Sequence, residues 1–224
     1  MSGEPARSRG RRAAVAKRHA LTNVRLIMEY PASPKTLDER YDYIRRESVP
    51  LAERWPNPPS ALQPLLQRLE QLGVLLLADH PKWDRISVKT QRLGSSVIVP
   101  GRQSIIWINF IRHNLPNTNT LIVPELIDTI FHEAIHTTGT LLGRFIIQPE
   151  DLAALDYIVE EVCALAGTSE LHRNIGDFSA ATSNKRAAQE QASKAKLPVP
   201  VRRVAIDKGN EAARFLLTSG AGPS

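Results

Sequence analysis

Apolar residues recur every three or four positions in several segments of the chain, which is the spacing of one buried helix face. The clearest stripe is a row of leucines within residues 60–72, and Pro64 falls in its first turn, where a helix tolerates proline. These segments are predicted to form helices over residues 36–47, 60–72, 124–138, 150–172 and 210–217.

Short runs of β-branched and apolar residues lie between the second and third of these helices. They predict strands over residues 85–89, 96–99 and 104–110. The last run is the strongest strand pattern in the chain, and we interpret it as a sheet edge to which an extended peptide could add. Residues 23–30 fit either a strand or a helix. Strands followed by helices predict an α+β fold, with a small mixed or antiparallel sheet packed on the later helices.

Composition narrows the class of protein. A chain of 224 residues with 42% apolar content can bury one good core. No apolar run approaches the roughly 20 residues that a membrane span needs, and no apolar signal segment follows the basic residues near the start. The single cysteine, Cys163, excludes a disulfide framework and is expected to be a buried thiol. We therefore expect a cytoplasmic protein with no membrane partner.

The net charge of +6 is concentrated at the two ends of the chain. Residues 1–20 hold six Lys/Arg against Glu4, and residues 179–224 hold eight Lys/Arg against three acidic residues. We therefore predict a disordered basic tail (1–20), a folded domain (21–178), a flexible basic linker (179–205) and a short C-terminal helix and tail (206–224). The basic ends either contact nucleic-acid phosphates non-specifically or are simply solvated, and the composition favours neither.

The motif H-E-x-x-H lies within the helix predicted over residues 124–138. Positions four apart share a helix face, so the imidazoles of His132 and His136 can converge on one zinc ion. Glu133 would then lie beside a metal-bound water, as a general base does in a metallopeptidase. A bare match also arises by chance in roughly one chain of this length per couple of hundred. The plain alternative is a helix with two surface histidines.

A catalytic zinc ion usually takes three protein ligands, with water in the fourth place. The following helix offers an adjacent carboxylate pair, Glu160 and Glu161. Helical spacing does not choose between them, because both flank the apolar face almost symmetrically. Without the upstream motif, the pair would be two solvated surface charges.

Several of these residues together carry a resemblance to a known family. The stretch His132-Glu133-x-x-His136-x-Thr138-Gly139, followed by Tyr157 and Glu160-Glu161-x-x-Ala164, resembles the metallopeptidase domain of ArdC-type antirestriction proteins. That domain also occurs in polyvalent proteins of phages and plasmids, and it belongs to a wider group that includes ImmA-like peptidases. The likeness covers about residues 95–217 and is weak over residues 173–205.

The resemblance implies a zincin-like metallopeptidase fold with one zinc ion per chain. The E-x-x-A spacing of that wider group favours Glu161 as the third ligand, with Glu160 as second choice. Leu165 departs from the pattern, because the family usually has an acidic residue there. The large single-stranded-DNA-binding domain of full antirestriction proteins is not evident in residues 1–94.

The resulting hypothesis is a zinc-dependent peptidase from a phage, plasmid or other mobile element, with a host-defence-countering or regulatory role. Glu133 serves as general base, and Tyr157 is either an oxyanion or substrate contact or a core residue. The remaining histidines outside the basic tail are expected to be exposed: His80, His113 and His172. Two alternatives stay open: a binding module without proteolysis, and a nucleic-acid-binding accessory protein with a structural zinc. The protein or peptide substrate and the oligomeric state are not predicted.

Overall fold

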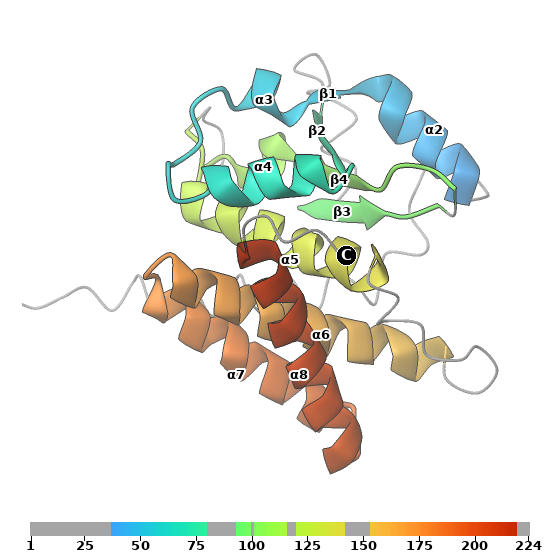
Figure 1. The fold of residues 1–224 in the computed structure, drawn as a ribbon, viewed down its shortest axis with the longest axis vertical. Helices are drawn as coiled ribbons and strands as arrows, with labels where there is room; N and C mark the ends of the chain where they lie inside the picture. Colours follow the sequence, from blue (N-terminus) through green and yellow to red (C-terminus); the bar gives the residue numbers. More distant parts are fainter. Residues whose placement is uncertain (1–36, 80–92, 100, 116–119, 142–152, 219–224) are drawn as a thin grey trace, which may run out of the picture.

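A four-stranded mixed sheet lies between two layers of helices (Figure 1). The computed structural model describes residues 37–79, 93–99, 101–115, 120–141 and 153–218. The basic tail (1–20), His80 and the segments predicted over residues 23–30 and 85–89 therefore lie outside the described residues. The described elements follow in this order: α2 (Leu37–Glu47), β1 (Ser48–Pro50), α3 (Leu51–Arg54), α4 (Gln63–Gln71), β2 (Leu75–Asp79), β3 (Gly94–Val97), β4 (Ile105–Ile108), a 3-10 helix (Phe110–His113), α5 (Val123–Leu141), α6 (Ala153–Asn174), α7 (Phe178–Lys194) and α8 (Val199–Leu217).

The strand order is β1-β2-β4-β3. The central pair, β2 and β4, is parallel, and the two outer pairs are antiparallel. The predicted α+β class with a small mixed sheet is confirmed. The interpretation of residues 104–110 as a sheet edge is wrong, because β4 lies between β2 and β3. Among the described strands, β1 and β3 are the outer ones.

Side chains alternate between the two faces of the sheet, as a pleated strand requires. Even-numbered residues such as Leu76 and Ile106 pack with α4 and α5 in the larger core. Odd-numbered residues such as Ile105 and Trp107 pack against Tyr41 of α2 in a second, smaller core. Because β4 is buried on both faces, its sequence is continuously apolar rather than alternating.

The structure differs most from the prediction in residues 179–205. These residues form α7 and the first part of α8, which pack against α6, rather than a flexible linker. Gly176, with a φ of +79°, ends α6, and Asp177 caps the N-terminus of α7 by accepting a hydrogen bond from the Ala180 amide. The buried face of α7 consists mainly of alanines, which give a weak hydrophobic pattern although they fit closely against α6.

Two of the three histidines that were expected to be exposed are buried. His113 has no exposed surface and His172 has 1%. Each is held by hydrogen bonds, which a single sequence does not reveal. The prediction for Cys163 is confirmed: the thiol is free and buried in α6, and burial raises its pKa to about 12.

Within the described part of the chain, no helix combines the length and apolar character that a membrane crossing requires.

Gly209 provides a test of the close packing between α6 and α8. In an ordinary helix interior, Gly→Ala stabilises a protein by about 1 kcal/mol. Here a Cβ would lie 2.1 Å from the carbonyl oxygen of Cys163 and 3.0 Å from the amide nitrogen of Gly167, and both atoms belong to backbone. We therefore expect Gly209→Ala to lower the free energy of unfolding by about 1–3 kcal/mol. Urea denaturation of the wild type and the variant measures this difference.

Ser193→Ala, at an exposed position on α7, is the control and should be neutral or slightly stabilising. A stabilising Gly209→Ala would show that α8 does not lie this close to α6.

Candidate metal centre

α5 carries both histidines of the H-E-x-x-H motif. It packs its apolar residues against the sheet and α6, and His132 lies with them, 3% exposed. The helix continues to Leu141 rather than ending before Gly139 as predicted. Thr137 and Thr138 donate their hydroxyl protons to the carbonyl oxygens of Glu133 and Ala134, so their polar groups are satisfied within the helix.

Glu161 of α6 meets the two histidines of α5. Its carboxylate oxygens lie 3.5 Å from Nε2 of His132 and 3.4 Å from Nε2 of His136. The two Nε2 atoms are 3.1 Å apart. His132 and Glu161 are buried, whereas His136 keeps 12% of its side chain exposed. The group is therefore enclosed by the core, with its exposed side at His136.

These distances fit a zinc ion. Ligand atoms about 2.0–2.2 Å from a tetrahedral zinc lie about 3.3–3.6 Å from one another. The three separations, between 3.1 and 3.5 Å, are close to that range. Two imidazole nitrogens and one carboxylate oxygen are also a common donor set for catalytic zinc. Within the described residues, His132, His136 and Glu161 are the group of three that could hold a metal ion.

The electrostatics of the group favour a positive charge at its centre. Burial acts to lower the pKa of His136, but the hydrogen bond to Glu161 and the negative charges of Glu161, Glu133 and Glu160 raise it to about 9. Burial likewise acts to raise the pKa of Glu161, yet the contacts with His132 and His136 hold it well below its usual range. A buried carboxylate is therefore kept ionised here by the positive charge that gathers opposite it.

Glu133 lies on the side of α5 that faces β3. A Cβ placed on Gly94, the first residue of β3, would lie 3.2 Å from Cγ of Glu133 and 2.7 Å from Cγ2 of Thr129. The missing side chain at residue 94 therefore lets an outer strand approach the helix beside Glu133. A lone glycine at the start of a short strand carries no sequence signal for this role.

The structure separates the other predicted site residues. Glu160 is only partly buried and does not belong to the group of three, although its charge acts on His136. Tyr157 is also partly buried and lies on α6, four residues and one turn before Glu161. We call His132, His136 and Glu161 the metal group. Whether it contacts a substrate stays a prediction. Sequence reasoning missed Asp128, which lies one turn before His132 on α5 and is hydrogen-bonded to two other helices.

No protein-family model, curated protein or solved structure matches the chain.

The choice between the two adjacent carboxylates can be tested with a matched pair of variants, Glu161→Gln and Glu160→Gln. Both remove one negative charge near His136. If Glu161 is the ligand, its replacement should weaken zinc binding by more than about 100-fold, beyond the range of outer-shell changes. Glu160→Gln should leave zinc affinity nearly unchanged. Competition with a chromophoric chelator measures both; equal losses, or the reverse order, would reject Glu161.

Gly94→Ala tests the approach of β3 to α5. The added methyl group would meet Thr129 and also the carbonyl oxygen of Trp107, at 3.2 Å. We expect the free energy of unfolding to fall by about 1–3 kcal/mol, as in other overpacked sites. Ser96→Ala adds no atoms to the same strand and should have little effect. Thermal and urea unfolding of the two variants provide the comparison. If Gly94→Ala left the free energy of unfolding unchanged, the close approach of β3 to α5 would be contradicted.

Proposed function

We propose that the protein is a zinc-dependent metallopeptidase with a zincin-like fold. His132, His136 and Glu161 hold one zinc ion, and Glu133 is the general base. The observation that carries the proposal is the convergence of the H-E-x-x-H turn and Glu161, whose ligand atoms lie within 4.8 Å of one another although they come from two helices. Three protein ligands leave one position of a tetrahedral zinc for water, as in catalytic rather than structural sites.

Zinc in such a site supplies an activated water and polarises a carbonyl group. Glu133 supplies the proton transfers. Its carboxylate accepts a proton from the water as oxygen attacks the peptide carbonyl, and it delivers that proton to the amine nitrogen as the C–N bond breaks. The placement of Glu133 supports this role, because its charge acts on His136 while its side chain remains partly exposed.

The outer strand β3 supports a peptide as the substrate class. It lies beside Glu133, and an extended peptide can add to an outer strand through main-chain hydrogen bonds. We expect a peptide to bind along β3 rather than along residues 104–110, because β4 is an interior strand.

The support for a biological role is the resemblance of the motif residues to ArdC-type and ImmA-like domains. We place the protein in the cytoplasm, as a factor of a mobile element that counters host defence or regulates the element. The basic character of residues 179–217 resides on ordered helices α7 and α8 and has no part in the proposed chemistry.

Glu133→Gln tests the proposal directly. It keeps the side-chain volume and is not a metal ligand, so zinc content should stay at one per chain. Hydrolysis of a peptide library, followed by mass spectrometry, should fall by about 10²–10⁴-fold, the usual contribution of a general base. Glu160→Gln is the matched control and should retain activity.

Two results would contradict the proposal. A zinc-loaded wild-type protein that cleaves no member of the library would favour the non-proteolytic binding module. A purified protein without stoichiometric zinc, in which His132→Ala changes nothing, would remove the metal centre itself.

A further inference from the structure

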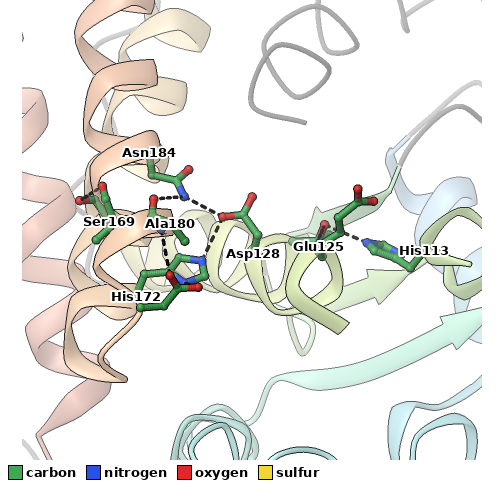
Figure 2. A network of polar contacts seen from close by, with 10 residues as sticks. His113, Glu125, Asp128, Ser169, His172, Ala180 and Asn184 are labelled. Atoms are coloured by element: carbon green, nitrogen blue, oxygen red, sulfur yellow. Dashed lines mark hydrogen bonds and ion pairs between the residues drawn. The ribbon is translucent and has the colours of Figure 1, made fainter. Parts of the chain in front are cut away.

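Asp128 of α5 is held by two other helices (Figure 2). Its Oδ1 atom accepts a hydrogen bond from Nε2 of His172 on α6, at 3.0 Å, and another from Nδ2 of Asn184 on α7, at 2.7 Å. Because a carboxylate only accepts, Nε2 of His172 carries the proton. Both donors are buried. A polar link of this kind inside a core is costly unless all its members are paired, so it constrains the geometry of the three helices.

The His172 ring is held on more than one side. The Phe131 ring packs edge-on against it with a centroid distance of 4.8 Å. Its Nδ1 atom lies 3.8 Å from Oδ2 of Asp177, the residue that caps α7. Rotation of the ring, or movement of α6 along α5, would therefore break several contacts at once.

The link and the metal group lie at opposite ends of one helix contact. Asp128 of α5 faces His172 of α6, whereas His136 of α5 faces Glu161 of α6. Between them, Ile135 lies where a side chain on Gly167 would be, 2.7 Å from its Cβ position. Residue numbers rise along α5 as they fall along α6, so the two helices run antiparallel. The Asp128–His172 link thus holds one part of the contact whose other part brings Glu161 to the histidines.

The next residue on α5 is anchored toward the sheet. Nε2 of His113 lies 2.9 Å from Oγ1 of Thr129, and Nδ1 lies 2.7 Å from the carbonyl oxygen of Asn109 (Figure 2 shows His113). Successive helix residues point about 100° apart, since a turn holds about 3.6 residues. Contacts at residues 128 and 129 in two directions therefore fix the rotation of α5 as well as its translation.

We infer that Asp128 and His172, with His113 and Thr129 as the second anchor, are positioning residues for the metal group. This inference rests on the proposed metal centre. A slip of one residue would shift α5 by about 1.5 Å and turn it by about 100°. Metal–ligand distances tolerate only about ±0.2 Å. The anchors thus preorganise the site, and the affinity for zinc depends on them although none of them is a ligand.

His172→Phe tests the inference, because it keeps a ring against Phe131 but removes the donor to Asp128. We expect the zinc dissociation constant, from chelator competition, to rise roughly 10-fold, the low end of the range for groups that hold a ligand directly, because His172 acts through the helices rather than on a ligand. The visible spectrum of the cobalt-substituted protein should also change, since it reports the geometry of the ligands. His172→Gln restores an amide donor and should recover most of the affinity.

Ser169→Ala is the matched control on the same helix. It removes a hydrogen bond from α6 to the Ala181 carbonyl of α7, and that bond does not involve α5. Zinc affinity and the cobalt spectrum should be unchanged. A loss equal to that of His172→Phe would overturn the inference, because general packing of α6 on α7 would then explain both.

The remaining outcomes separate the inference from the proposed function. If the wild-type protein binds no zinc, the metal centre and its positioning residues are both wrong. If the wild type binds zinc and His172→Phe binds it equally well, only the positioning role is wrong. Should His172→Phe fail to fold, Asp128→Ala replaces it. This variant removes the acceptor of both hydrogen bonds, and unchanged zinc affinity and cobalt spectrum would again overturn the inference.

Discussion

The antiparallel contact between α5 and α6 is the constraint on which the other features depend. Its middle is Gly167, where Ile135 of α5 and the carbonyl oxygen of Gly209 of α8 would each lie 2.7 Å from a Cβ atom. Three helices can meet this closely only because residue 167 has no side chain. At one end of this contact, Glu161 meets two histidines of the neighbouring helix.

Close packing also brings Glu161 the two histidines that keep its carboxylate ionised in a largely apolar setting. Removing a carboxylate from water costs on the order of several kcal/mol unless opposite charge or hydrogen bonds replace the lost hydration. At Glu161 the replacement comes from His132 and His136. The same layer of helices contains a second compensated set, in which Asp128 is paired with His172 and Asn184. Each of these two sets joins different elements of the fold.

The sequence allowed the elements with strong periodicity to be predicted, and these include the two helices of the metal group. The α+β class and helix α4 followed from the leucine stripe and from the order of the segments. Strand β2 was missed because a run of leucines that packs against apolar residues on both faces of the sheet lacks an alternating pattern. α7 was missed because alanine gives little hydrophobic signal, although Ala181, Ala188 and Ala192 pack closely on α6.

The metal group was predictable only in part. The i, i+4 spacing brings His132 and His136 to one face without any tertiary information. The choice of Glu161 over Glu160 depended on a family likeness, since the rotation of α6 is set by packing at Gly167 and by the Asp128–His172 link. Long-range hydrogen bonds of this kind join residues 44 and 56 positions apart. A single sequence has no local pattern that records them.

Cys163 can report on the contact between α6 and α8, because it lies where α8 packs against α6. It is the only cysteine in the chain, its thiol has no exposed surface, and the backbone of Gly209 lies against its carbonyl group. Thiolate is the reactive form, and burial with a pKa of about 12 suppresses it while α8 is seated on α6. The protein thus contains a natural reporter of local opening: the rate at which an alkylating reagent modifies Cys163 measures how often this helix layer comes apart.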